Sequence, residues 1–525
     1  MRRVYGRKVK ALIRGGLAET NRNERFKPCS DVWLNGEKSA EVIVAARRRT
    51  EQQQILELVK GRDMCGKQKI PKGGCPGMDR LEAEEEPEAR SVSCRDMREK
   101  NGGDLLESIV SRENMVRAYK QVRKNGGAPG VDGMTIDGLK TYLSEHYESL
   151  ISSILAGTYR PLPVRRVEIP KPDGGVRLLG VPTVKDRMVQ QAVAQVLMPI
   201  FEQTFSDSSY GFRPGRSAKQ AIQKARDLYN EGYRYVADLD LSKYFDTINH
   251  ELLLNMLREE ITDKAVIRLV KLFLKSGVMA NGVLTQTESG SPQGGPLSPL
   301  LSNIYLTKFD KEMERRGHKF VRYADDVNVY TRSRRAAQRV LSSCKEYLET
   351  KLKLKVNEKK SEAGSPLRLK FLGFSLRPTQ KGHASIRIHE KAIARFKNNI
   401  RELLRRNQGR SIKKVLDRLN LYTRGWLNYY SIADAKSFIQ QMNERIGRKI
   451  RAYIWKQWKR IKCRVENLQR LGIPRSKAWE WANTRLGIWR IAGSWVMTRS
   501  ITNQQLEILG YEDILKRYNA LHSNC

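Results

Sequence analysis

Cysteine is scarce in this sequence. The seven cysteines among 525 residues are too few and too scattered for a disulfide framework. Four of them lie in the first hundred residues, but no pair has the two-to-four-residue separation of a structural zinc site. The seven are Cys29, Cys65, Cys75, Cys94, Cys344, Cys463 and Cys525. The pattern predicts free thiols in a reducing compartment.

Long apolar runs and acidic residues are also in short supply. No apolar stretch approaches the roughly 18 residues that suggest a membrane span, and the basic start at residues 1–7 lacks the apolar stretch of a signal peptide. Asp and Glu number 57 against 98 Lys and Arg, a net charge of +41. A field this positive attracts polyanions, and phosphate neutralisation releases condensed counterions. We therefore expect a cytoplasmic protein that associates with nucleic acid, not with membranes.

The chain divides into parts of different character. Residues 1–100 show little sustained periodicity and are expected to form a weakly structured extension of unknown function. Residues 161–384 alternate strand-like segments with amphipathic helices, which predicts an α+β body. Beyond residue 389, apolar residues recur at steps of three and four, as in Phe438, Met442, Ile446 and Ile450, so a helical bundle follows.

Charge and tryptophan concentrate in the last quarter of the chain. Residues 391–525 hold 29 Lys and Arg against 9 Asp and Glu, and every tryptophan except Trp33. Basic residues interleaved with aromatics supply phosphate contacts and stacking platforms together. The alternative is a helical core in which the tryptophans are buried and the cations solvated.

Adjacent carboxylates mark the most informative segment. Apolar alternation on both sides of Asp325 and Asp326 predicts two short strands joined at the aspartate pair. Like charges repel there unless a divalent cation neutralises them, and oxygen ligands suit Mg²⁺. A second strand places Asp238 and Asp240 on one face. Spacing alone does not choose between them, and the alternative for Asp238 is a solvated or strand-edge charge.

These segments resemble the blocks of group II intron reverse transcriptases, in the same order. The palm resemblance rests on Asp240–Asp246, Ser291–Tyr305 and Tyr323–Asp326, with later palm motifs at Asn357–Ser361 and Phe371–Phe374. Ile169–Pro182 and Phe205–Arg216 resemble the fingers, and Gly425–Tyr430 with Trp455–Trp458 resembles the maturase region. The resemblance covers about residues 105–520. It implies a right-hand polymerase, with fingers and an antiparallel palm sheet, then an all-α thumb and a small basic C-terminal domain.

The resemblance also assigns roles to single residues. Asp240, Asp325 and Asp326 would be catalytic and would hold two Mg²⁺ ions. Lys360 would act near the pyrophosphate as a general acid, although a solvated cation is the alternative. Substrate-binding roles fall on Lys171, Arg177, Phe245, Gln293 and Gly294. Of these, Phe245 would exclude a 2′-hydroxyl, unless it is an ordinary core aromatic. The two cations could equally be surface residues, and Gly294 also suits a turn that caps a helix.

The family pattern implies domain limits and partners as well. It places fingers and palm at 101–384, the thumb or maturase domain at 385–455 and a DNA-binding region at 456–525. The implied partners are a group II intron RNA, an RNA template with a DNA primer, target DNA and dNTPs, and a homodimer is compatible with the sequence. The nucleic-acid-binding residues expected in the last two regions are Trp426, Tyr429, Arg451, Trp455, Lys456, Trp458, Lys459 and Arg460. A bacterial type without an HNH endonuclease domain is expected, because no Cys/His cluster follows.

The expected function is RNA-directed DNA synthesis combined with intron RNA binding, splicing assistance and retromobility by target-primed reverse transcription. Two alternatives stay open. One is a splicing-only maturase, against which the intact aspartates argue. The other is a domesticated relative in DNA repair or phage defence, which protein sequence hardly separates from a mobile one. An RNA-copying polymerase of viral type is more distant, because Phe245 predicts dNTP preference.

Overall fold

The structure, a computed structural model, describes residues 104–170, 176–280, 283–285, 290, 294–380 and 382–523. Several sequence-based expectations fall outside these ranges. They are the N-terminal extension with its four cysteines, Cys525, Lys171, Gln293 and, although its backbone is described, the side chain of Arg177.

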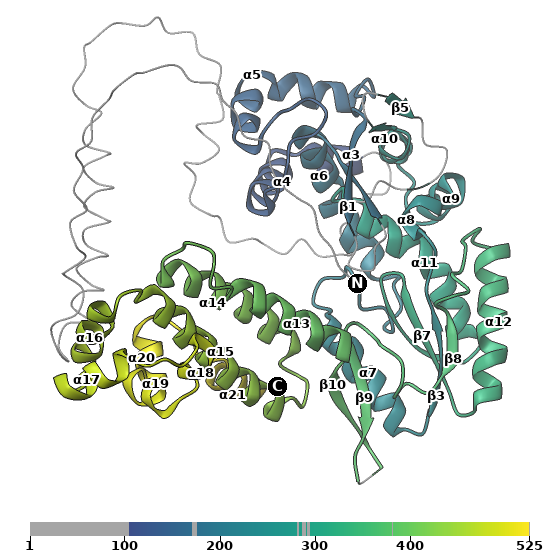
Figure 1. Cartoon of the computed structure of the whole chain (residues 1–525). Helices are drawn as coiled ribbons and strands as arrows, with labels where there is room; N and C mark the ends of the chain where they lie inside the picture. Colours follow the sequence, from purple (N-terminus) through teal and green to yellow (C-terminus); the bar gives the residue numbers. More distant parts are fainter. Residues whose placement is uncertain are drawn as a thin grey trace, which may run out of the picture.

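Helices and a small sheet form the first part of the body, drawn in blue in Figure 1. Its elements are α3 (Asp104–Val110), α4 (Arg112–Asn125), α5 (Ile136–Leu155), β1 (Val164–Pro170), β2 (Val176–Val181) and α6 (Val184–Glu202). The sheet has the order β2-β1-β4-β5, where β4 is Val278–Ala280 and β5 is Val283–Thr285. Because β1 pairs with β4 in parallel, this sheet is not antiparallel throughout.

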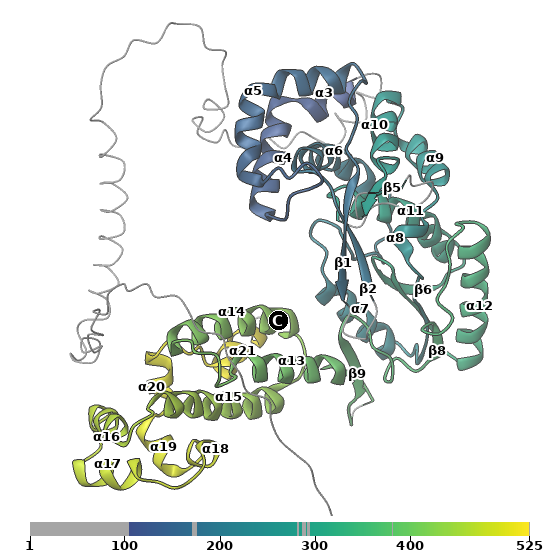
Figure 2. The same ribbon diagram turned by 45° about the horizontal axis from the view of Figure 1, so that its top comes forward.

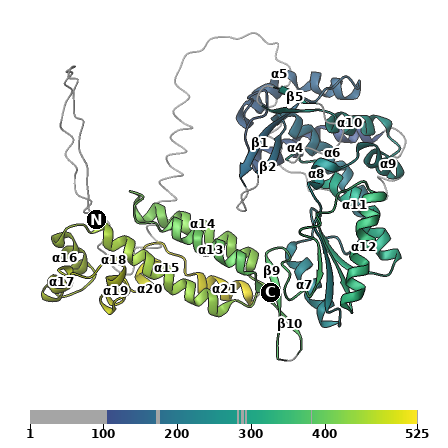
Figure 3. The same cartoon turned by 45° about the vertical axis from the view of Figure 1, so that its right-hand side comes forward.

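A second, fully antiparallel sheet lies at the centre of the body. Its strands β3 (Tyr235–Leu239), β6 (Lys319–Tyr323), β7 (Asp326–Thr331) and β8 (Glu362–Gly364) follow the order β6-β7-β3-β8. Alternate residues belong to different cores: Val236 lies in the core that includes α7 (Ala218–Asn230), whereas Ala237 lies in the core that includes α11 (Ser298–Arg315). The sheet is therefore covered on both faces, and α12 (Arg334–Thr350) packs on β3, β7 and β8 (Figure 3). The remaining helices of the body are α8 (Tyr244–Thr247), α9 (His250–Glu260) and α10 (Lys264–Leu274).

A hairpin of β9 (Phe374–Pro378) and β10 (Ala384–Ile388) leads from the body into a helical bundle. The bundle consists of α13 (Glu390–Leu403), α14 (Ile412–Tyr430), α15 (Lys436–Gln457), α16 (Ile461–Arg470), α17 (Arg475–Ala482), α18 (Ile488–Ile491), α19 (Trp495–Ser500), α20 (Asn503–Ile508) and α21 (Ile514–His522). It lies beside the body in both views, with α16 to α19 at the end far from the sheet (Figures 1 and 2).

One hydrophobic core joins the bundle to the hairpin and to α7. The expected limit between residues 455 and 456 falls inside α15, which continues to Gln457. The mixed helix and sheet class is thus present, followed by helices alone. Among the described helices, none combines the length and the apolarity that crossing a bilayer would require.

Candidate polymerase site

The predicted aspartate hairpin is present. Strand β6 ends at Tyr323, which pairs with Asp326 at the start of β7, so Ala324 and Asp325 form a two-residue turn. Ala324 has a φ of +58°, a left-handed conformation that costs a residue with a Cβ roughly 1–2 kcal/mol. Such strain persists only where the surroundings impose it. The turn is thus held in place by its neighbours.

Residues Asn357–Ser361 wrap around Asp240, which follows the last residue of β3. The Asn357 side-chain amide donates to Asp240 Oδ2 at 3.0 Å, and the Asp240 backbone N–H donates to the Ser361 hydroxyl at 3.0 Å. Lys360 Nζ lies 3.5 Å from Asp240 Oδ2. The structure therefore brings together two of the predicted catalytic residues, Asp240 and Lys360, and adds Asn357, whose contact the sequence did not indicate.

Asp240 lies close enough to Asp326 of the hairpin for their charges to repel each other. Burial, and then the charges of Asp325 and Asp240, raise the pKa of Asp326 to about 6, while Lys370 and Lys360 oppose the shift. A nearby cation lowers the pKa of carboxylates clustered in this way, and so keeps them charged at neutral pH. Within the described part of the chain, however, no three His, Cys, Asp or Glu side chains are arranged as a ready metal-binding group.

Asp238 does not lie at the edge of a sheet, so that part of the expectation is wrong. Strand β3 is central, and Asp238 pairs with Asn328 of β7 on one side and Glu362 of β8 on the other. The Asn328 amide, oriented with its nitrogen toward Asp238, donates to Oδ1 at 2.7 Å. Because side chains alternate along a strand, Asp238 shares a sheet face with Asp240. It lies one step further into the protein.

Replacement of Asp238 with asparagine should stabilise the protein in the absence of divalent ions. Burial, and then repulsion by Asp326 and Asp240, raise the pKa of Asp238 to about 7. A pKa raised by folding contributes stability below the unfolded pKa of about 4, and this contribution is lost as the pH rises through about 7. At about pH 8 we expect Asp238→Asn to increase the free energy of unfolding by an amount on the order of 1–3 kcal/mol. Thermal melts at about pH 5 and pH 8 measure it, and parallel pH dependence in both proteins would contradict the assignment.

Two predicted substrate residues, Phe245 and Gly294, line an open cavity. Sequence reasoning did not name Asn125, Arg187 or Gln191, which line it too. The guanidinium of Arg187 donates to the Ala128 carbonyl oxygen at 2.6 Å and so holds the loop after α4 at the cavity. Nothing local to the sequence pairs that loop with α6.

Buried contacts fix both predicted residues. The hydroxyl of Tyr244 donates to the Ser302 carbonyl oxygen at 2.8 Å, and its ring meets Phe245 edge-on at 5.3 Å between centroids. Phe245 is half-buried, so it is a core aromatic on one side and a cavity wall on the other. Gly294 has a φ of +130°, and a Cβ there would lie 2.3 Å from the Gly180 carbonyl oxygen. Only glycine fits that close approach.

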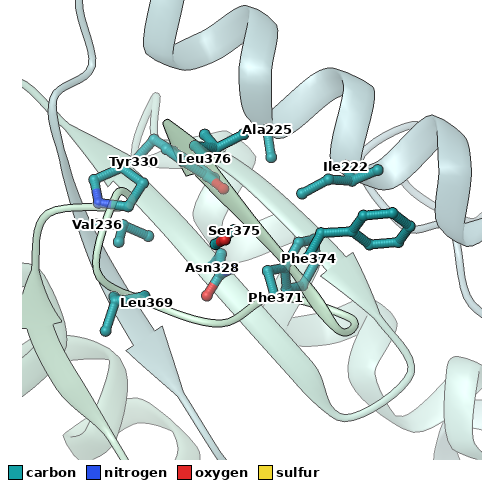
Figure 4. A pocket seen from close by; sticks show the side chains of 11 residues that line it. Ile222, Ala225, Val236, Asn328, Tyr330, Leu369, Phe371, Phe374, Ser375 and Leu376 are labelled. Atoms are coloured by element: carbon teal, nitrogen blue, oxygen red, sulfur yellow. The ribbon is translucent and has the colours of Figure 1, made fainter. Parts of the chain in front are cut away.

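A second, small cavity lies on the sheet face that carries Asp238 (Figure 4). Val236 and Asn328 border it from the central sheet, and Ile222 and Phe374 from α7 and β9. The cavity contains none of the predicted site residues. Its largely apolar lining makes it part of the packing among the central sheet, α7 and β9.

The predicted nucleic-acid contacts divide into buried and accessible residues. Trp455 is 1% exposed and packs against Trp458, and Arg451 is 6% exposed and donates to the Ile501 carbonyl oxygen at 2.7 Å. For these two, a role in the core replaces the expected surface contact, because neither can reach a ligand. The other predicted contacts are accessible or half-buried. They are Trp426, Tyr429, Lys456, Trp458, Lys459 and Arg460.

Three other tryptophans are exposed. Trp479 on α17 is 44% exposed, Trp489 on α18 is 42% exposed and Trp495 on α19 is 63% exposed. The Arg448 guanidinium of α15 lies 4.2 Å from the Trp489 ring centroid, and the buried Trp481 meets Trp495 edge-on at 5.1 Å. We name Trp479, Trp489 and Trp495 the distal tryptophan surface. Sequence composition indicated aromatics in this region but not which of them face solvent.

Comparisons with known proteins match two parts of the chain. Residues 169–376 match the model of the reverse transcriptase (RNA-dependent DNA polymerase) domain. Residues 393–472 match the group II intron maturase-specific domain. Protein YkfC of Escherichia coli (strain K12) is 34% identical over 298 residues, which cover 49% of this chain and 78% of YkfC.

Intron-encoded relatives match as well. The group II intron-encoded protein LtrA of Lactococcus lactis subsp. cremoris is 30% identical over 355 residues, 55% of this chain and 58% of LtrA. A putative COX1/OXI3 intron 2 protein of Saccharomyces cerevisiae is 37% identical over 258 residues, 48% of this chain and 29% of that protein. Among solved structures, a chain of the partial Cas6-RT-Cas1--Cas2 complex has 24% identity over 47% of this chain and 43% of its own, at a TM-score of 0.31, which is too low for a comparison of folds. The chain belongs to the family of group II intron-encoded reverse transcriptases and maturases.

Proposed function

We propose that this protein is an RNA-directed DNA polymerase that also binds a group II intron RNA, assists its splicing and supports target-primed reverse transcription. The observation that carries the proposal is the meeting of β3 with the hairpin of β6 and β7. There burial and the charges of Asp325 and Asp240 raise the pKa of Asp326, and the Asn357–Ser361 segment holds Lys360 Nζ 3.5 Å from Asp240 Oδ2.

The carboxylates have the donor chemistry that Mg²⁺ prefers. Asp240, Asp325 and Asp326 would hold two ions, which would activate a primer 3′-hydroxyl and neutralise the triphosphate of the incoming dNTP. Their mutual repulsion supports this role, since repelling carboxylates favour a bound cation. Lys360 is exposed and its Nζ lies 3.5 Å from Asp240 Oδ2, and in this proposal it would donate a proton to the leaving pyrophosphate.

The open cavity is the proposed dNTP and template site. Phe245 would face the sugar, and the Gly294 backbone would lie against the nascent base pair. Arg187 would position the loop of Gly126 and Ala128 at the template. Lys171 and Arg177 keep their proposed contacts to the triphosphate. In the right-hand description, β1 and β2 belong to fingers, the central sheet is the palm, and α13 to α15 form the thumb.

The bundle is the proposed binding surface for intron RNA and target DNA. Exposed cations at Lys459 and Arg460 would contact phosphates, and the distal tryptophan surface would stack on unpaired bases. Residues 475–500 hold five Lys and Arg against one Asp or Glu, so the same surface attracts a polyanion. This moves the proposed aromatic contacts from buried Trp455 to exposed Trp495.

Primer extension on an RNA template with Mg²⁺ and dNTPs tests the proposal, beside binding to RNA transcribed from the protein's own locus. We expect DNA synthesis and salt-sensitive RNA binding. Trp495→Ala should weaken nucleic-acid binding by about 1–3 kcal/mol and leave the extension of a saturated primer unchanged. The matched truncation of buried Trp481 should act on thermal stability instead. Binding without any dNTP incorporation would favour a splicing-only maturase.

A further inference from the structure

A buried arginine contacts the turn of Ala324 and Asp325. Arg322 of β6 has no exposed side-chain surface. Its guanidinium donates to both carboxylate oxygens of Asp310 on α11, with Nε 2.8 Å from Oδ1 and Nη2 2.5 Å from Oδ2. The remaining nitrogen, Nη1, donates to Asn303 Oδ1 at 3.1 Å and to the Ala324 carbonyl oxygen at 3.0 Å. One side chain thus joins a helix to the turn that presents the aspartates.

The same arginine holds the backbone that passes behind the turn. The Arg322 N–H donates to the Ser208 carbonyl oxygen at 2.9 Å, and its own carbonyl accepts from the Tyr210 N–H at 2.8 Å. Asn303 Nδ2 donates to the Gly211 carbonyl oxygen at 2.8 Å, and a Cβ on Gly211 would lie 2.3 Å from the Ala324 nitrogen. The left-handed turn is therefore fixed from two sides, by the guanidinium and by the Gly211 backbone.

We propose that Arg322 is a positioning residue for polymerisation, which acts through the Ala324 carbonyl to hold Asp325 and Asp326 where they bind divalent ions. The inference rests on the proposed function for the identity of those ligands. Full burial keeps Arg322 away from substrate, so it acts only through the turn. A guanidinium donates in several fixed directions at once, which the single ammonium of lysine does not reproduce.

A purely stabilising ion pair is the competing explanation. Burying two charges removes their hydration, which offsets much of their attraction, so such a pair is an inefficient source of stability. The pair instead sets direction: Asp310 fixes the guanidinium plane, and the free branch then points at the turn. The two explanations predict different divalent-ion affinities for a folded variant of Arg322.

The test is the full-length Arg322→Lys protein, with Mn²⁺ as a spectroscopic probe. Electron paramagnetic resonance of free Mn²⁺ gives the affinity without any need for turnover. We expect the Mn²⁺ dissociation constant to rise and kcat to fall by about 10–100-fold each, with KM for the template–primer unchanged. Arg451→Lys is the matched control, because that guanidinium is also buried but lies in the bundle, where it binds the Ile501 carbonyl oxygen and the Asn503 side chain. It should lower the melting temperature comparably and leave Mn²⁺ affinity unchanged.

Asn303→Ala covers the case in which Arg322→Lys does not fold. It leaves the Arg322–Asp310 pair in place and removes the second support of Nη1, so Mn²⁺ affinity should fall in the same direction by a smaller factor. Parent-like Mn²⁺ affinity and kcat in folded Arg322→Lys, or in Asn303→Ala where that variant alone folds, overturn the inference alone. A parent protein that binds no Mn²⁺ and makes no DNA overturns the proposed function, and this inference with it.

Discussion

Protein that carries Asp325→Ala with Asp326→Ala is expected to lose DNA synthesis by at least about 10³-fold. The two substitutions remove the carboxylates of the hairpin and leave Asp240 alone with Lys360 and Asn357. Nothing at the positively charged bundle changes, so RNA binding should stay at the parent level. Primer extension and filter binding on the same preparation measure the two effects separately.

A matched control removes two exposed carboxylates elsewhere. Glu145→Ala with Glu349→Ala changes net charge by the same amount at exposed positions of α5 and α12. Primer extension by this protein should match the parent, which excludes a general effect of charge on template binding. DNA synthesis that survives in the hairpin variant would mean that the polymerase site has been assigned to the wrong carboxylates.

Phe245→Ala is expected to admit ribonucleotides. The half-buried ring forms part of the cavity wall, and its removal leaves space where a 2′-hydroxyl would otherwise meet carbon. A pocket that discriminates by shape against one added hydroxyl reaches about 10²-fold, so we expect a loss of preference of that order. The ratio of kcat/KM for dGTP and GTP opposite one template base measures it.

Truncation of another half-buried phenylalanine provides the control. Phe438 packs in the bundle core, away from the cavity, so Phe438→Ala should cost stability without changing nucleotide preference. Efficient use of GTP by the unmodified protein would refute the role of Phe245. The variant also separates the two earlier interpretations of this residue, since a purely structural aromatic would affect only stability.

Local patterns predicted the aspartate hairpin of β6 and β7 well. The period of two on either side of Asp325 and Asp326 predicted both strands, and the same period in the earlier segment predicted that Asp238 and Asp240 point to one side of the sheet. The pattern could not reveal the order of strands across the sheet, because β8 arrives from far along the chain. That strand covers β3 and makes Asp238 internal, which is why the edge placement failed.

Helical periodicity predicted the burial of Trp455 better than composition did. The apolar series through Met442, Ile446 and Ile450 continues by one turn to Ile454, beside Trp455. That continuation places Trp455 against the core, whereas the basic and aromatic composition suggested a surface. The helices α17 to α19 are too short for such a series, so the exposure of Trp495 had no local signal.

Arg322 shows a limit of a different kind. An arginine between Val321 and Tyr323 in an apolar strand is unusual, because charged side chains are rarely buried without a partner. The partner, Asp310, lies in a helix whose sequence gives no sign of contact with the strand. Only the packed structure shows that the charge faces inward.

Helix α15 gives the bundle a mechanical property. Its 22 residues form an uninterrupted rod about 33 Å long, with Phe438 near one end and Arg448 beside Trp489 further along. A stiff rod that spans the expected limit between thumb and DNA-binding region has no joint at that point. Tilting one end of α15 would therefore displace the opposite end as well, so the two proposed nucleic-acid-binding regions would move together.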